Sequence, residues 1–302
     1  MSAEQRARVI AAAMGFPETS PVSPAATDDP VAQAEVLIDK AIALSRQGRR
    51  EASAEMLNGV IATLTRLRDE SATAPGGLDR TLFRAAWRLA VVLQMGTDAV
   101  AALRAGRQAL ELGRALLAGD ADEQVIAGVV VMAADVAEIF FATGLTDAGL
   151  DLLMEAEQWS GDGTEPALLR ARSTVLHNWT AAGLRMLAAP EAPEPTRQSL
   201  ENLAATATEA VGLRRRLRDP SDGVSLYELA NSLRLLAQIR IALGDNAPGA
   251  DSVAEAYGQV ESLSPGQAVN QLKSQLDAMV RILERIAPAD VAQQRAMGRI
   301  PG

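Results

Sequence analysis

The sequence predicts an all-α fold, built as a right-handed α-solenoid of about five helix hairpins with a C-terminal capping helix. Three observations support this prediction. Hydrophobic residues make up 48% of the 302 residues but aromatic residues only 3%, so small aliphatic side chains must fill the core, which favours closely packed helices. No Asn-Gly or Asp-Gly pair lies between two alternating apolar runs. Glycines recur at an interval of 48 residues, at Gly48, Gly96 and Gly144, between long runs with helical periodicity.

The two ends of the chain are expected to lie outside the repeats. Residues 3–14 are predicted to form a short amphipathic helix. Residues 15–30, GFPETSPVSPAATDDP, are predicted to form an extended linker because they hold four prolines together with serine and threonine. The linker is long enough for the short helix to dock on the repeats of the same chain. Residues 289–302 are expected to be a flexible tail.

Residues 31–288 are predicted to form the repeat domain, in which ten helices alternate with short breaks rich in glycine or proline. A final capping helix is expected to begin with Ser264 as its N-cap and to end near Ile286. Ser225 and Glu228 have the spacing of a second capping box.

Small residues recur at two positions when the segments are aligned on their glycines, the fourth of which is Gly244. Seven residues before the glycines stand Ala41, Leu89, Ala137 and Ala237, and five residues after them stand Ser53, Ala101, Gly149 and Gly249. Small side chains allow two helix backbones to approach closely. We therefore expect the two helices of each hairpin to cross at these positions.

This pattern resembles the tetratricopeptide repeat, here with a period of 48 residues instead of the usual length of about 34. The stretch 209–245 is most similar to the long repeats of actinobacterial signalling proteins, and the resemblance extends over about 31–262. The matching motifs are Glu209-Ala210-Val211, Asp219-Pro220, Leu229-Ala230-Asn231-Ser232-Leu233 and Leu243-Gly244. The resemblance implies a scaffold or regulatory adaptor that takes part in signalling and binds a protein or peptide segment.

In a superhelix of this type, the first helix of each hairpin lines the concave surface. The alignment predicts that this groove contains Glu35, Ile38, Ile42, Arg46, Phe83, Ala86, Gln94, Ala134, Glu138, Phe141, Asn231, Arg234 and Gln238. A surface that mixes charged, amide and aromatic groups suits a peptide held by a few anchoring contacts.

Two alternative functions remain open at this stage. The only histidine, His177, lies near Trp179 and Arg172 and could line a pocket of a small-molecule or peptide sensor, or it could be a partly buried structural residue. Asp135 and Glu138 lie three residues apart and so share a helix face, where they could form an acid–base pair, a cation site or polar lining of the groove. An enzyme is the least favoured class, because histidine, cysteine and lysine are scarce.

Several classes of cofactor and partner are not expected. The chain has no cysteine and no phosphate-loop, Rossmann or His-Glu-x-x-His motif, so we predict neither a metal nor a cofactor. The net charge of −9 argues against a nucleic-acid partner. The basic group Arg214, Arg215, Arg216 and Arg218 is instead expected at the C-terminus of a helix, where cations are favourable.

The expected location is the cytoplasm of a bacterium. The N-terminus has only a short apolar stretch, which is a poor secretion signal. The most apolar segment, residues 125–142, is interrupted by Asp135 and Glu138, so it is interpreted as a central helix and not as a membrane span. Strong use of arginine and alanine is typical of a GC-rich bacterial genome. Homo-oligomerisation cannot be derived from the sequence.

Overall fold

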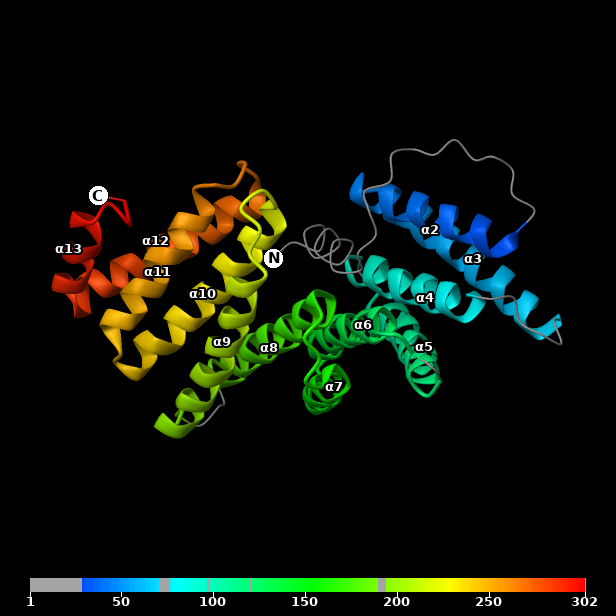
Figure 1. The fold of residues 1–302 in the computed structure, drawn as a ribbon, viewed down its shortest axis with the longest axis horizontal. Helices are drawn as coiled ribbons and strands as arrows, with labels where there is room; N and C mark the ends of the chain where they lie inside the picture. The colour runs from blue at the N-terminus through cyan, green and yellow to red at the C-terminus, as the bar shows by residue number, and fades with distance from the viewer. Residues whose placement is uncertain (1–28, 71–76, 97, 120, 190–193, 302) are drawn as a thin grey trace. The chain divides into compact units, whose positions relative to one another are not determined.

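The computed structural model describes residues 29–70, 77–96, 98–119, 121–189 and 194–301. The predicted helix over residues 3–14 and nearly all of the predicted linker lie outside this part of the chain. The described residues form twelve α-helices and no strand (Figure 1). The helices are α2 (Pro30–Arg46), α3 (Arg50–Glu70), α4 (Leu78–Gln94), α5 (Ala99–Leu117), α6 (Glu123–Ala142), α7 (Thr146–Ser160), α8 (Pro166–Leu187), α9 (Arg197–Arg216), α10 (Gly223–Leu243), α11 (Asn246–Val260), α12 (Gln267–Ile286) and α13 (Pro288–Ala296). The predicted all-α class is confirmed.

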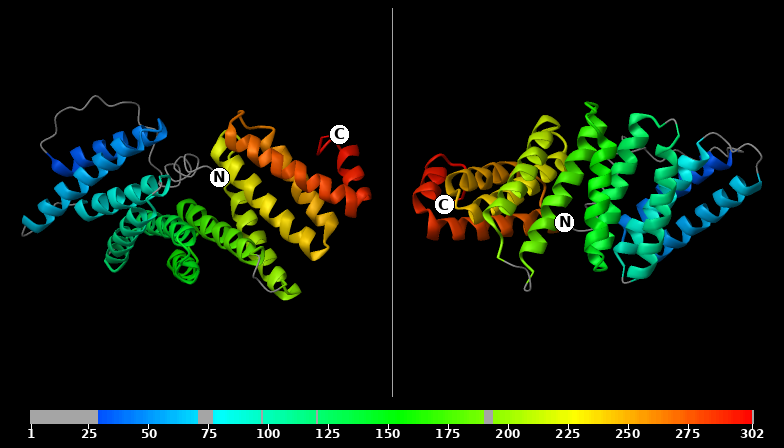
Figure 2. Two further views of the ribbon diagram at one scale, coloured as in Figure 1. Left: turned by 180° about the vertical axis from the view of Figure 1, so that it is seen from behind. Right: turned by 90° about the horizontal axis from the view of Figure 1, so that it is seen from below.

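The helices belong to two compact units, Met1–Ala171 and Arg172–Gly302, and α8 crosses the boundary between them. In the first unit, α2 packs with α3, α4 with α5, and α6 with α7, so each consecutive pair forms a hairpin. In the second unit, α10 packs with α9 and α11, and α12 packs on α11 and α10. Figure 2 shows these pairs from two further sides.

Three of the four aligned glycines form the turn that the repeat predicts. Gly48, Gly144 and Gly244 have φ values of 81°, 79° and 84°, a left-handed conformation that favours glycine. In each turn the next residue donates its N–H to a carbonyl five residues back, as Leu145 does to Phe140 at 2.9 Å. This bond satisfies a carbonyl that the helix end leaves without a partner. Gly96 differs, because its φ lies outside the left-handed region.

The small residues lie where paired helices approach, as predicted. Ser53 is fully buried, and its Oγ donates to the Ala41 carbonyl across the first hairpin at 2.7 Å. Ala137 is fully buried and Gly149 is also buried. A Cβ atom at Gly149 would lie only 2.5 Å from Cε1 of Phe141, so the ring of Phe141 occupies the space that a larger residue would need.

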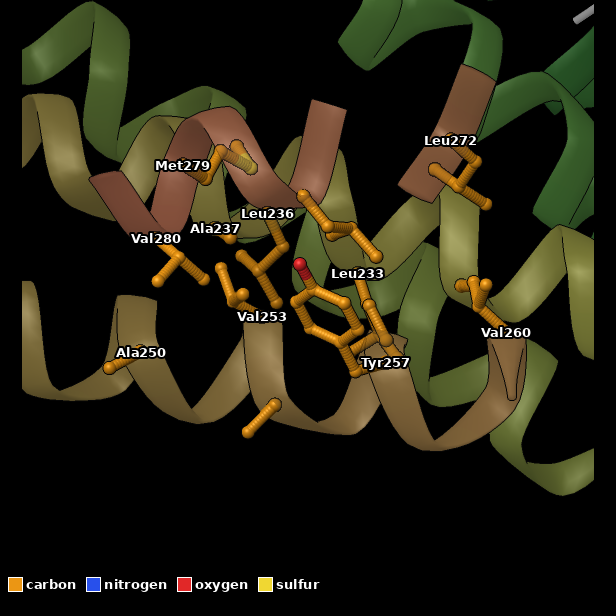
Figure 3. Packing of buried hydrophobic residues seen from close by; sticks show 14 of the residues in the cluster. Leu233, Leu236, Ala237, Ala250, Val253, Tyr257, Val260, Leu272, Met279 and Val280 are labelled. Carbon is orange, nitrogen blue, oxygen red and sulfur yellow. The ribbon is translucent and has the colours of Figure 1, made fainter. Parts of the chain in front are cut away.

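The core of the second unit is mainly aliphatic and includes two tyrosines, Tyr227 and the fully buried Tyr257. Figure 3 shows Tyr257 among Leu233, Leu236 and Val253 from α10 and α11, with Leu272 from α12 beside them. The Tyr257 hydroxyl donates to the Asp277 carboxylate. Burial, followed by this bond, raises the pKa of Tyr257. Since α12 supplies part of this core, the predicted capping helix completes the unit.

The structure corrects both predicted N-caps. Helix α10 begins after Asp222, whose carboxylate accepts a hydrogen bond from Val224 N at 2.9 Å, while Ser225 Oγ accepts from Asp219 N. The Ser225–Glu228 capping box is therefore absent. Helix α12 begins after Gly266, with no side-chain cap, and Ser264 lies outside the helix.

The predicted flexible tail over residues 289–302 is also corrected, because its first part is helix α13. Val291, Gln294 and Ile300 are buried, and Gln294 Nε2 donates to Asp251 of α11 at 2.8 Å. Proline at the first position of α13 costs no hydrogen bond, so the short helix can begin directly after α12. Arg295 of α13 also pairs with Glu284 of α12 at 2.5 Å, so the segment is held by both apolar and polar contacts.

Helix α6 is long and apolar enough to cross a membrane by length and composition, and it is the one described helix with this property. However, 78% of its most apolar window is buried inside the fold. Its helix neighbours α4, α5 and α7 supply this cover. This arrangement agrees with a central helix of the first unit.

We predict that Gly149→Ala destabilises the protein by about 1–3 kcal/mol, because the added methyl group displaces the Phe141 ring. Gly59→Ala in α3 is the matched control. A Cβ there meets nothing within 4 Å, so improved helix propensity should stabilise the protein by about 0.5–1 kcal/mol. Urea unfolding followed by circular dichroism measures both. Equal stabilisation by the two substitutions would show that the close contact at Gly149 has no energetic consequence.

Candidate binding surfaces on the first helices of the hairpins

A cavity of about 250 Å³ lies in the first unit. Its lining comes mainly from α2, α4 and α6, the first helices of three consecutive hairpins. The lining residues are Glu35, Arg80, Phe83, Arg84, Leu116, Gln124, Val125 and Gly128. The structure therefore brings together two residues, Glu35 and Phe83, that the repeat alignment assigned to one surface.

The charged groups of the first cavity are held by one another. Arg84 binds the carboxylates of Glu35 and Asp39, the second at 2.5 Å. Glu35 also accepts a hydrogen bond from the Thr81 hydroxyl at 2.6 Å. Arg80, at the rim, pairs with Asp122 at 2.7 Å. Burial lowers the pKa of Arg84 to about 10, so the two carboxylates stabilise a cation that the fold has largely removed from water.

The buried cation Arg88 lies one helical turn after Arg84. Its guanidinium stacks over the ring of Trp87, 4.6 Å from the centroid. Burial and then the charge of Arg84 lower the pKa of Arg88 to about 9, while Asp135 acts in the opposite direction. Trp87 Nε1 donates to Asp135 Oδ2 at 2.9 Å. The hydrogen bond between Trp87 and Asp135 therefore joins α4 to α6.

The predicted Asp135–Glu138 pair does not form an open acidic site. Both residues are 7% exposed, and Asp135 is engaged by Trp87. Among the described residues, no cluster of three histidine, cysteine, aspartate or glutamate side chains could hold a metal ion. Phe83 and Trp87 are buried, with ring centroids 6.0 Å apart, as expected of core residues.

A chain of hydrogen bonds connects three helices of the second unit. Arg214 Nη1 donates to Ser232 Oγ at 2.6 Å, His177 Nδ1 lies 2.9 Å from the same oxygen, and His177 Nε2 lies 3.2 Å from Asn231 Nδ2. Arg234 Nε donates to Asn231 Oδ1 at 3.1 Å. His177 is buried, so the predicted pocket at this residue is occupied by protein groups.

The direction of these bonds assigns the tautomer of His177. Arg234 has only donors, so Asn231 must direct its oxygen toward Arg234 and its amide nitrogen toward His177. His177 Nε2 must then accept, and Nδ1 carries the proton and donates to Ser232. The network therefore orients the His177 ring and holds the Arg234 side chain through its Nε atom.

A second cavity, of about 340 Å³, lies between α10 and α12. The lining residues are Arg234, Gln238, Ile241, Gln275, Ala278, Met279 and Ile282. The repeat alignment predicted Arg234 and Gln238 but missed the contribution of α12. The signal was present in the sequence, because Gln275, Met279 and Ile282 have the spacing of one helix face.

The other predicted residues lie outside the two cavities. Ile38, Ala86 and Ala134 are fully buried and cannot line a groove. Phe141 packs on Gly149, and Glu138 is buried. Arg46, Ile42 and Gln94 are half-buried. Arg172 pairs with Glu209 at 2.7 Å, and Trp179 packs against the core cluster of the second unit.

Three residues of the basic group, Arg214, Arg215 and Arg216, lie in the last turn of α9 as predicted, and Arg218 follows the C-cap residue Leu217. The members of this group have different roles. Arg214 is buried and also donates to the Glu228 carbonyl at 2.7 Å. Arg215 pairs with Glu255, and Arg218 donates to Gln259 at 2.9 Å. These bonds connect α9 to α10 and α11.

No family model and no curated protein matches this sequence. Solved structures do match. A kinesin light chain protein of Podospora anserina with nearly identical TPR-like repeats has a TM-score of 0.51 at 12% identity, over 86% of this chain and all of its own. The Pseudomonas aeruginosa pilF product has a TM-score of 0.42 at 16% identity, over 89% of this chain and all of its own. A nuclear import adaptor of S. pombe has a TM-score of 0.40 at 12% identity, over 89% of this chain and 97% of its own.

The kinesin light chain similarity concerns the fold alone. Together with the twelve described helices, it confirms the predicted TPR-like α-solenoid. The sequence identity in this comparison is only 12%, so the chain is a divergent example of the fold.

We predict that Asp135→Ala destabilises the protein by about 3 kcal/mol, because it leaves Trp87 Nε1 without its acceptor and removes one of the two carboxylates, Asp135 and Asp39, that act on the buried Arg88. Asp151→Ala, at an exposed position of α7, is the control and should change stability by less than about 0.5 kcal/mol. The free energy of unfolding in urea at neutral pH distinguishes the two. Similar values for both variants would contradict a structural role for Asp135.

Proposed function

We propose that this protein is a non-catalytic scaffold or regulatory adaptor that binds a segment of another protein along the first helices of its hairpins. The observation that carries the proposal is the position of the two cavities. The first is lined mainly by the first helices α2, α4 and α6, and the second by the first helix α10 together with the capping helix α12. Each combines an apolar floor with a few polar groups. Such surfaces suit a peptide with a small number of anchoring side chains.

The polar chemistry around the cavities supports binding in preference to catalysis. Arg84, Asp135 and His177 are the groups that a reaction would most readily use, and each is engaged by other protein groups. These contacts stabilise helix packing. The TPR-like fold agrees with a scaffold role in general.

A sensor with a pocket beside His177, Trp179 and Arg172 has less support. His177 is hydrogen-bonded on both nitrogens, and Arg172 is paired with Glu209. Neither cavity described above is lined by these residues. The proposal further places the scaffold in bacterial cytoplasmic signalling, for which composition and the repeat resemblance are the support.

We predict that random peptides displayed on phage yield binders to the full-length chain, and that filling a cavity weakens their binding by about tenfold or more. Val125→Trp fills the first cavity and Ala278→Trp the second. Val100→Trp, at a residue 68% exposed and outside both cavities, is the matched control. Fluorescence anisotropy of synthetic copies of the selected peptides measures the affinities.

The control variant should bind every selected peptide as the wild-type protein does. The proposal fails if no peptide is enriched above background. It also fails if the selected peptides bind both filled variants with unchanged affinity.

A further inference from the structure

Arg234 is a half-buried cation that has no carboxylate partner among the described residues. Its one hydrogen bond is from Nε to the neutral amide of Asn231 at 3.1 Å. No ion pair involves it, and burial lowers its pKa. Removing a cation from water without a countercharge is unfavourable. The fold therefore holds the guanidinium in a state that an anion would stabilise.

Several other arginines of the second unit have acceptors for their terminal nitrogens or an acidic partner. Arg172 binds Glu209 at 2.7 Å and Arg295 binds Glu284 at 2.5 Å, while Arg215 binds Glu255. The buried Arg214 has a carbonyl and a hydroxyl as acceptors. Acidic residues are plentiful in this chain, with 38 aspartates and glutamates against 29 basic residues. The absence of an acidic partner for Arg234 is therefore not explained by a shortage of acidic residues in the sequence.

The network behind Arg234 orients the guanidinium. Asn231 binds Nε, and His177 in turn accepts from the Asn231 amide. The two terminal Nη groups remain as donors along one edge of the guanidinium. Two parallel N–H groups on such an edge match the two oxygens of a carboxylate. A positioned arginine binds with less loss of side-chain entropy than a mobile one.

The rest of the second cavity provides apolar surface and amides. Ile241, Met279 and Ile282 contribute aliphatic side chains, and Ile282 is 39% exposed. Gln238 on α10 and Gln275 on α12 contribute one amide from each helix. A glutamine amide both donates and accepts, so it can bind the main chain of a peptide.

We propose that the second cavity binds an acidic side chain within a peptide segment, flanked by aliphatic residues, with its carboxylate on Arg234. The amides on both helices favour a chain that continues on either side of the acidic residue, and not a terminal carboxylate. This inference rests on the proposed function and specifies the chemistry of one of its two surfaces.

The test uses the full-length protein and fluorescein-labelled peptides that are acetylated and amidated at their ends. One peptide has a Leu-Glu-Ile core, and a second has Leu-Gln-Ile in the same flanking sequence. A third ends in Leu-Gln-Ile with a free carboxylate. We expect the glutamate peptide to bind about tenfold more tightly than either of the others. Arg234→Gln should abolish this preference.

Arg285→Gln is the matched control, because it removes the same charge from an exposed position of α12 outside the cavity. It should preserve the preference for glutamate. Arg234→Lys should retain part of the preference, since it keeps the charge but not the planar pair of donors. Thermal unfolding followed by circular dichroism verifies that each variant is folded. If Arg234→Gln does not fold, the result for Arg234→Lys decides the test.

Equal binding of the glutamate and glutamine peptides would overturn the inference, as would a preference that survives in Arg234→Gln. Tighter binding of the peptide with the free carboxylate would overturn the assignment to an internal side chain. None of these results contradicts the proposed function, provided that the phage-selected peptides still bind more weakly to the variants with filled cavities. Absence of any selected peptide would instead reject the proposed function itself.

Discussion

The close approach of the paired helices is the constraint on which the rest of the structure depends. Left-handed glycines reverse the chain, and small residues such as Ser53 and Gly149 then allow the backbones to meet. With so few aromatic residues in the sequence, only this close packing can fill the interior with alanine, valine and leucine. First helices of successive hairpins are thereby brought next to each other, as α2 and α4 are. The cavities form along these helices.

The polar groups inside the fold have a second role. Asp135 with Trp87, and Asn231 with His177, fix the relative positions of neighbouring helices through directional bonds that aliphatic contacts do not provide. Several charged groups are paired across helices, as Arg84 is with Glu35 and Arg215 is with Glu255. Arg234 differs from these arginines, because its one hydrogen bond is to a neutral amide.

The helices, their turns and the crossing positions could be predicted because their signals are local or periodic. The caps of α10 were harder, because Asp222 and Ser225 both have suitable side chains and only the final geometry chooses between them. Helix α13 was missed because it is short and largely polar, and it is stabilised by the burial of Val291 and of Ile300, which follows the helix.

The repeat alignment assigned Glu35 and Arg234 to the correct helix face but placed Ile38 and Ala134 there as well. It missed α12 because that helix lies outside the repeat. The hydrogen-bond network joins residues about fifty positions apart, such as His177 and Ser232, and no local pattern indicates it.

The hydrogen-bond chain gives the protein an internal spectroscopic reporter. His177 is the only histidine among the 302 residues, so its imidazole signals in a nitrogen-15 spectrum need no sequence-specific assignment. The tautomer fixed by Asn231 and Ser232 should give one nitrogen resonance of the protonated type and one of the unprotonated type. A ligand that moves the Arg234 guanidinium should change the position of Asn231 and therefore its hydrogen bond to His177 Nε2. We expect the resonance of the unprotonated nitrogen to shift as a result. Events in the cavity between α10 and α12 can thus be followed from the neighbouring helix α8, without introducing a label at the binding surface.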